Sequence, residues 1–251
     1  MGPPRLSAKL DERSRAAKAQ KIATLSGIAR PPPGAAMLYC GSGSGDFAAY
    51  FSRLGFGESG TFAVDAVDTE AVGSEYQFSG VLGSELPFPD GRFDFIISNH
   101  VIKHFADREQ RTHLAEIGRC LRDNGKLYLA VPNRWGLIDA HHRLPFLGWL
   151  PRPLAHLYLR LTRKADSYEW YPLSRREVLR LLRHEGFQAE DVTLDALRLA
   201  GEMEKTGLLR LVSGMPPWVL RLIRPVVPTL FFVCTRRESG AQKPIGQIGS
   251  D

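Results

Sequence analysis

The chain has 251 residues, a formal net charge of +6 and 43% hydrophobic residues. This length suits one α/β domain with insertions, long enough to bury a full core. No uncharged apolar run approaches the roughly 18 residues that a membrane span requires, and no apolar signal-peptide core follows the first residues. The three cysteines are widely spaced, odd in number and without metal-ligand spacing. We therefore expect a reduced, cytoplasmic protein without a metal site.

The basic residues are concentrated outside the stretch that precedes residue 134. Residues 31–133 hold eight basic and thirteen acidic side chains, whereas residues 134–183 hold ten basic and four acidic ones. This distribution indicates an anionic partner that meets the later segment. Arginines that only solvate amphipathic helices would give the same pattern. No RNA-binding module is recognisable, so we expect no nucleic-acid partner.

The first predicted element is an amphipathic helix over residues 8–28, rich in Ala, Lys and Arg. Residues 31–34, Pro-Pro-Pro-Gly, end it, because proline fixes φ and has no backbone N–H group. Residues 1–34 are therefore expected to form a helical segment ahead of the main domain.

A short strand over Met37–Cys40 is predicted to run into a turn with three glycines, Gly41, Gly43 and Gly45. Such a turn needs backbone conformations that a Cβ atom disfavours, and it leaves bare backbone against which a ligand can lie. Residues 47–54 have helical character, so their first amide groups would point into the same crevice. This combination forms the nucleotide-binding corner of doubly wound α/β folds. A glycine-rich surface loop without a ligand is the alternative.

A second short strand, Thr61–Asp65, ends in an acid about 20 residues after the glycine turn, where a carboxylate can accept hydrogen bonds from both hydroxyls of a ribose. The dinucleotide fingerprint G-x-G-x-x-G would require its third glycine at position 46. That position holds Asp46, and the third glycine comes one residue earlier. A further strand is predicted over residues 76–81.

The next buried strand is predicted over residues 93–99, a short apolar run after a Pro-Asp-Gly turn. Its carboxyl end carries Asn99 and His100. In open α/β sheets this end of the central strands faces the ligand crevice, so both are expected to touch a cofactor. His104 follows as a candidate substrate contact, and a histidine hydrogen-bonded at a helix start is the competing interpretation.

After a helix over residues 108–122 and another strand, the regular pattern stops. Residues 134–172 are predicted to form an insertion over the mouth of the site, with leucines at helical spacing over residues 154–161. A histidine pair, His141 and His142, lies in a loop rich in proline and aromatic residues and is a reasonable substrate contact. No further Cys, His or acidic cluster accompanies the pair, so we expect no metal there.

The C-terminal part is predicted to add a helix that stops at Gly186 and a strand over residues 189–194. A second added segment over residues 206–226 and a last strand over residues 229–235 follow. The tail beyond residue 237 has the composition of a disordered segment.

Three stretches, residues 38–45, 86–99 and 121–133, together resemble a known family. In order and spacing they are similar to the first glycine motif, the fourth strand with its preceding Leu-Pro-Phe, and the fifth strand of class I S-adenosylmethionine-dependent methyltransferases. The closest resemblance is to the small-molecule branch that includes quinone-biosynthesis enzymes. It implies a doubly wound, mostly parallel, seven-stranded Rossmann-like α/β fold with helical lid insertions. It also implies S-adenosylmethionine as the cofactor.

On this basis the methyltransferase domain is expected over residues 35–237, with insertions at 134–172 and 200–228 and a disordered tail over 238–251. The resemblance and the strand ends together place the cofactor at Gly41, Ser42, Gly43, Gly45, Asp65, Ala66, Glu85, Leu86, Asn99 and His100.

The chain departs from the family pattern at three positions. Tyr39 stands where relatives usually carry Asp, Leu82 where they carry an acid that meets the adenine, and Lys103 where Glu commonly precedes the histidine. These departures bear on cofactor affinity more than on the fold.

The resulting hypothesis is methyl transfer to an oxygen or nitrogen of a small or lipid-linked acceptor, which the basic insertions suggest is anionic. A hydroxyl acceptor needs a base with a pKa near neutral, for which histidine is suited, and His104 and His142 are the candidates. The two basic, aromatic-bearing insertions could also rest on a membrane surface, so a membrane-associated cytoplasmic protein is one expectation. An ordinary hydrophobic lid packed on its own domain would look the same.

Two alternatives belong to other functional classes. A nicotinamide-dependent oxidoreductase would use the same glycine corner, but the displaced third glycine argues against it. A non-catalytic binding protein with a decayed pocket is favoured by Tyr39 and Leu82.

Overall fold

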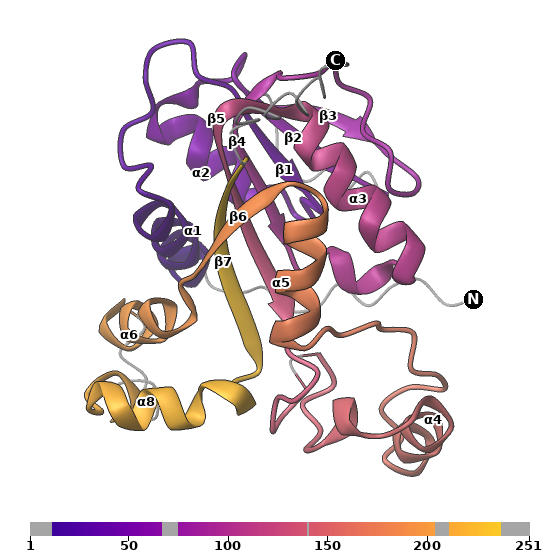
Figure 1. Ribbon diagram of the computed structural model, residues 1–251. Coiled ribbons are helices and arrows are strands. Elements are labelled where there is room, and N and C mark those ends of the chain that lie inside the picture. Colours follow the sequence, from indigo (N-terminus) through magenta and orange to yellow (C-terminus); the bar gives the residue numbers. More distant parts are fainter. Residues whose placement is uncertain (1–11, 67–74, 140, 204–210, 237–251) are drawn as a thin grey trace, which may run out of the picture.

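The computed structural model describes residues 12–66, 75–139, 141–203 and 211–236 (Figure 1), so the predicted tail over residues 238–251 lies outside them. Seven strands form one sheet: β1 (Met37–Cys40), β2 (Thr61–Asp65), β3 (Gln77–Gly80), β4 (Phe93–Asn99), β5 (Leu121–Pro132), β6 (Phe187–Asp191) and β7 (Thr229–Arg236). Their order is β3-β2-β1-β4-β5-β7-β6. Among these described strands β7 alone runs opposite to the others. The predicted mostly parallel seven-stranded sheet is confirmed.

Helices cover both faces of the sheet. The helices in the described residues are α1 (Glu12–Ser26), α2 (Asp46–Phe51), α3 (Asp107–Cys120), α4 (Arg152–Leu161), α5 (Arg175–His184), α6 (Thr193–Met203) and α8 (Pro217–Ile223). Short helical turns are η1 (Ser52–Phe56), η2 (Ile102–His104), η3 (Leu147–Trp149) and η4 (Arg224–Val226). Helices α1, α2 and α6 lie on one side of the sheet, and α3 and α5 lie on the other (Figure 1).

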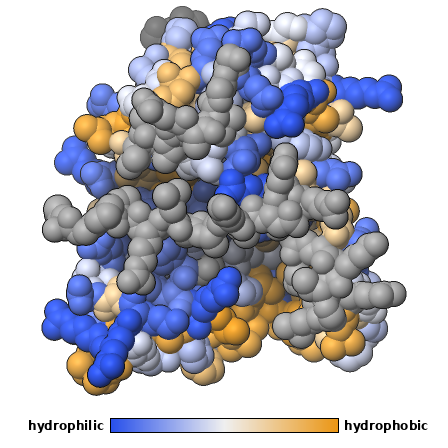
Figure 2. Space-filling model, turned by 180° about the vertical axis from the view of Figure 1, so that it is seen from behind, coloured by the Kyte–Doolittle hydropathy of each residue, from blue (hydrophilic) through white to orange (hydrophobic). Residues whose placement is uncertain are grey.

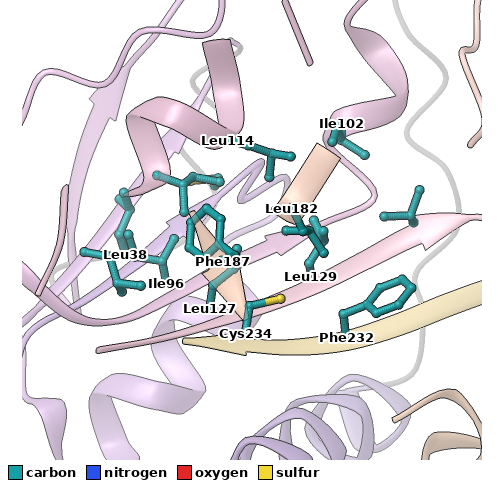
Figure 3. Close-up of a cluster of buried hydrophobic side chains, with 14 of the residues drawn as sticks. Leu38, Ile96, Ile102, Leu114, Leu127, Leu129, Leu182, Phe187, Phe232 and Cys234 are labelled. Carbon is teal, nitrogen blue, oxygen red and sulfur yellow. The ribbon is translucent and has the colours of Figure 1, made fainter. Parts of the chain in front are cut away.

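The central strands are buried because helices pack on both of their faces. Every residue of β1 is buried, and so are five of the seven in β4, as expected for continuous apolar runs in a parallel sheet. Figure 3 shows one of the two resulting cores, in which Leu38, Ile96 and Leu129 of the sheet meet Leu114 of α3 and Leu182 of α5. The other core joins the opposite face of the sheet to α1 and α2.

The boundary between α3 and β5 differs from the prediction. The helix ends at Cys120 rather than Arg122, and Leu121 already pairs with Phe93 of β4. The next pairing joins Lys126 to Phe95, so the residues between bulge from the sheet. Leu121 is fully buried, and its burial outweighs the local helix-stop signal that Asp-Asn-Gly provides.

The two segments predicted as insertions meet at the end of the sheet where β5 finishes. The side-chain amide of Asn133 donates hydrogen bonds to the carbonyls of Pro225 and Val227, both at 2.8 Å, and the backbone N–H of Leu137 donates to Val226 at 3.0 Å. Figure 1 shows α4 and α8 at this same end of the molecule. The chain after β5 and the chain before β7 therefore form one continuous surface.

The first insertion has a small hydrophobic cluster of its own. Leu144, Leu147, Ala155, Leu159 and Tyr168 form it, separate from the two cores of the sheet. Within the described residues, no helix combines the length and the apolar character needed to cross a bilayer.

Candidate functional site

A cavity of about 430 Å³ opens at the carboxyl ends of β1, β2 and β4. Its volume falls in the range of about 300–1,000 Å³ typical of small-molecule sites. Six of the residues predicted to bind the cofactor border it: Gly41, Asp65, Ala66, Leu86, Asn99 and His100. Parallel strands end together at one edge of a sheet, which is why these residues converge.

The glycine turn makes room for two neighbouring side chains. Gly41 has a φ of +71°, and a Cβ atom there would lie 2.3 Å from Cγ2 of Val101. A Cβ atom at Gly45 would lie 1.9 Å from the hydroxyl of Tyr76, whereas one at Gly43 would meet nothing within 4 Å. The turn therefore requires glycine for close packing at two positions and leaves bare backbone at the third.

Asp65 is tied to the glycine turn at the edge of the cavity. Its Oδ2 accepts a hydrogen bond from the backbone N–H of Gly43, and its Oδ1 accepts one from Ala66, both at 2.7 Å. A carboxylate oxygen can accept more than one hydrogen bond. Such a carboxylate can hold the two hydroxyls of a ribose.

Tyr39, where the chain departs from the family pattern, does not border the cavity. Its ring stacks on Phe47 with the centroids 5.6 Å apart, in the core that faces α1 and α2. Burial raises the pKa of Tyr39, although a hydrogen bond with Asn99 opposes the shift. Tyr39 therefore contacts Asn99 from the core side of the sheet and does not occupy the cavity.

A second cavity of about 270 Å³ adjoins the first, and His100 and Lys103 border both. Asp139, His141, Tyr168 and Trp170 from the first insertion complete much of its wall. His100 has a φ of +60°, a backbone conformation that is costly for a residue with a side chain and that is concentrated at functional sites. One cavity thus meets the glycine turn, and the other meets the insertion.

A family model described as a methyltransferase domain matches residues 10–192. The chain belongs to this methyltransferase family. S-Adenosylmethionine is its cofactor, as membership of this family implies.

The methyltransferase is similar to several known proteins. It is 28% identical to the ubiquinone/menaquinone biosynthesis C-methyltransferase UbiE of Vibrio vulnificus over 203 residues, which cover 73% of this chain and 69% of that protein. A Burkholderia thailandensis 1,6-didemethyltoxoflavin-N1-methyltransferase, solved with S-adenosylhomocysteine, shares the fold at 19% identity and a TM-score of 0.51, covering 92% of this chain and 80% of that one. A SAM-dependent methyltransferase from Archaeoglobus fulgidus shares it at 12% identity and a TM-score of 0.55, covering 88% and 94%.

Lys103 lies where the two cavities of the methyltransferase meet, and its charge affects the pKa values of the histidines around it. Its ammonium lies 3.9 Å from the ring centroid of Trp170, and burial lowers its pKa while Asp139 opposes that shift. Burial and then the charge of Lys103 lower the pKa of His100 and of His104 to about 4. The same two causes lower the pKa of His141. Near neutral pH these imidazoles are uncharged beside one cation.

The two histidines predicted as bases lie in different places. His104 borders the cofactor cavity, with its ring 4.5 Å from that of Trp170. His142 borders neither cavity; its side chain is 7% exposed, its ring centroid lies 6.0 Å from that of Tyr168, and its Nδ1 lies 3.1 Å from Oδ1 of Asp139. A base with a pKa of about 4 is weak at neutral pH, so the expectation of a near-neutral histidine does not fit His104.

Four predicted cofactor residues lie outside the cavity wall. Ser42 is buried, and the backbone N–H of Gly43 donates a hydrogen bond to Asp65, which borders the first cavity. Gly45 begins α2 and packs against Tyr76, and Glu85 is exposed. In the described part of the methyltransferase no group of His, Cys, Asp and Glu side chains could hold a metal ion.

Sequence reasoning assigned no role to several residues that border the second cavity. Lys103 stood out only as a departure from the family pattern. Tyr168 and Trp170 are separated from the histidine pair by helix α4. A usable signal was the recurrence of aromatic residues over residues 168–171 at the end of the insertion. Nothing local indicated that Trp170 would meet Lys103.

Proposed function

We propose that this methyltransferase transfers the methyl group of S-adenosylmethionine to an oxygen or nitrogen of a small or lipid-linked acceptor held in the second cavity. The adjoining cavities that share His100 and Lys103 carry this proposal. The bound cofactor supplies an electrophilic methyl group. The acceptor's lone pair forms the new bond as the carbon–sulfur bond breaks, which leaves S-adenosylhomocysteine and a proton to be removed.

The protein's part in this reaction is binding and orientation. Asp65 and the glycine turn hold the adenosyl end, while Asn99 and His100 border the cavity toward the second site. Holding two reactants in line can supply about 7–11 kcal/mol of a barrier. Membership of the methyltransferase family favours this chemistry over a nicotinamide-dependent oxidoreductase and over a non-catalytic binding protein.

The acceptor group that fits the second cavity is an ionisable hydroxyl or another anionic group. Lys103 is the cation that faces both cavities, and the imidazoles beside it are uncharged near neutral pH. A positive charge within a few ångströms lowers the pKa of a hydroxyl by stabilising its oxyanion. With that help a weakly basic His104 is sufficient to take the proton. His142, the second candidate, borders neither cavity and would have to act through a neighbouring group.

The cavity size favours an acceptor of which only the reacting part enters. About 270 Å³ is below the range that encloses a drug-sized molecule, about 300–1,000 Å³. A lipid-linked head group fits this description, because the remainder of the molecule would extend past the exposed insertion. UbiE of Vibrio vulnificus, a relative at 28% identity, is named as a quinone-biosynthesis C-methyltransferase, so carbon is the competing acceptor atom.

Calorimetric titration with S-adenosylmethionine, S-adenosylhomocysteine and NAD⁺ tests the cofactor. We expect the first two to bind and NAD⁺ not to bind. Asp65→Asn should weaken binding about tenfold to hundredfold, because hydrogen bonds to a charged group contribute about 1.5–3 kcal/mol. Glu85→Gln is the matched control, since this exposed carboxylate does not border the cavity. Absence of S-adenosylmethionine binding at millimolar concentration would refute the proposal.

A labelled methyl donor with separate aqueous and lipid extracts then tests the acceptor. We expect label in a product whose new methyl group is bound to oxygen or nitrogen, as NMR of the purified product shows; a carbon-bound methyl would correct the acceptor atom. With that acceptor, Lys103→Met should move the acidic limb of the pH profile of kcat upward by about 1–3 units. Lys103→Arg, which keeps the charge, should not.

A further inference from the structure

Exposed hydrophobic side chains gather on the two added segments. Of the large hydrophobic residues that are exposed in the described parts of the chain, all but Leu82 lie in residues 135–161 or 211–222. They are Trp135, Leu137, Ile138, Phe146, Trp149, Leu154, Leu157, Leu161, Leu211, Trp218 and Leu222. Figure 2 shows hydrophobic residues along the lower end of the molecule, the end where Figure 1 places α4 and α8. We call residues 135–139, 141–164 and 211–222 together the basal face.

The basal face is one surface rather than two separate patches. The loop before α4 is hydrogen-bonded to η4, which directly follows α8. Gly136 lies so close that a Cβ atom on it would meet Pro228 at 3.1 Å. The loop that leads to α4 and the turn that follows α8 are therefore joined, and both helices lie at the same end of the molecule (Figure 1).

Helix α4 has more apolar surface than its own packing uses. Ala155 and Leu159 fill the cluster inside the insertion. Leu154 and Leu157 are each 52% exposed, and Leu161 is 74% exposed. A soluble protein rarely leaves a contiguous apolar surface of this kind without a partner.

The aromatic residues of the basal face are of the kind that favours a boundary between oil and water. Three of the four tryptophans of the chain, Trp135, Trp149 and Trp218, are 43–64% exposed. The indole ring is large and apolar but carries one N–H donor, so it partitions to membrane interfaces. Trp149 already donates its indole N–H to the carbonyl of Gly136 at 3.3 Å.

The charges beside these side chains are almost all positive. Residues 134–164 hold six basic side chains and one acid, Asp139, while residues 211–224 hold two basic side chains and no acid. Asp139 borders the second cavity and lies 3.1 Å from His142. In the described residues no carboxylate pairs with Arg143, Arg160, Arg163 or Lys164. The basal face thus combines apolar side chains with unneutralised cations.

We infer that the basal face docks on a bilayer that contains anionic phospholipid. Leucine and tryptophan side chains would enter the region between head groups and acyl chains, and the arginines and Lys164 would meet lipid phosphates. A second copy is a poorer occupant, because a symmetric contact through this face would bring the same cations together.

Docking would place the second cavity beside the lipid. His141 borders that cavity and lies in the same loop as Phe146 and Trp149, whose rings are 5.3 Å apart. The inference does not rest on the proposed methyl transfer, since a surface can bind lipid whatever the site catalyses. It does explain how a lipid-linked acceptor would reach the site.

Flotation with vesicles tests the inference. The wild-type chain should float with vesicles of equal parts phosphatidylcholine and phosphatidylglycerol, much less with phosphatidylcholine alone, and less as salt is added. The double variant Leu157→Glu/Trp218→Glu should weaken vesicle binding at least about tenfold, because two apolar side chains that would enter the lipid are lost. Leu82→Glu is the matched control, a leucine 89% exposed outside the basal face, and it should bind as the wild type does.

Charge variants separate the electrostatic part. Arg160→Gln/Arg163→Gln/Lys164→Gln should lose binding to the anionic vesicles, whereas Arg160→Lys/Arg163→Lys should keep it. The inference is overturned if the wild type does not float with anionic vesicles, or if Leu82→Glu loses as much binding as the basal-face double variant. It is also overturned if sedimentation shows a dimer that the double variant dissociates. Calorimetry with S-adenosylmethionine on each variant separates these results from failure of the proposed function or of folding.

Discussion

Replacing Gly41 by alanine tests how the glycine turn packs against the chain after β4. A Cβ atom there would lie 2.3 Å from Cγ2 of Val101, and the φ of +71° disfavours any side chain. The left-handed backbone costs roughly 1–2 kcal/mol, and forcing an extra carbon into a packed site costs about 1–3 kcal/mol. The loss of unfolded-chain entropy returns about 0.4–1 kcal/mol. We expect the free energy of unfolding to fall by about 1–4.5 kcal/mol.

Urea unfolding without cofactor measures this change through the midpoint and the slope. Gly34→Ala is the control for the backbone cost alone, because Gly34 has a φ of +76° and a Cβ atom there meets nothing within 4 Å. In the double variant with Val101→Ala the clash is absent. The free energy of unfolding should therefore fall by about 1–3 kcal/mol less than the sum of the two single changes. The reasoning fails if Gly41→Ala costs no more than Gly34→Ala, or if the double variant is additive to within about 0.5 kcal/mol.

Three further outcomes are expected. Arg119 lowers the pKa of Glu116 by hydrogen bonding, so the pair stabilises the fold above the ordinary carboxyl pKa of 4.5 and loses this effect as the pH falls through the lower folded-state value. Arg119→Met should cost about 1–2 kcal/mol in urea unfolding at pH 7 and less toward pH 3; a cost that does not change with pH would contradict this. Trp170→Ala should lower kcat/KM about tenfold to hundredfold with the affinity for S-adenosylmethionine unchanged, and equal weakening of both would place Trp170 in the cofactor site instead. The three cysteine thiols are buried, which raises the pKa of each, so a thiol reagent should react in urea but not with the native protein, and one fast-reacting native thiol would show otherwise.

The fold was predictable because its strands are short apolar runs with clear boundaries. Met37–Cys40 and Phe93–Asn99 are strands over the ranges expected from their composition. The start of β5 at Leu121 was not predictable, because it depends on pairing with Phe93, 28 residues earlier in the chain. Local helix-stop residues carry no information about such a pairing.

The candidate site was predictable only where local spacing defines it. The glycine turn and Asp65 follow from a strand, a turn and a second strand in sequence, and the structure brings Gly43 and Asp65 within hydrogen-bonding distance at 2.7 Å. The contact of Lys103 with Trp170 joins two segments that no periodicity relates. The weak basicity of His104 likewise depends on burial and on Lys103, neither of which the sequence displays.

The separate cluster of the first insertion has a consequence for how specificity can change. Leu144, Leu147, Ala155, Leu159 and Tyr168 are fixed mainly by one another. Exchanging this segment for another of similar span would leave the nucleotide-binding scaffold intact, because the cores of the sheet do not depend on this cluster. Selection can therefore redesign what the enzyme modifies while the apparatus that delivers the methyl group is inherited unchanged.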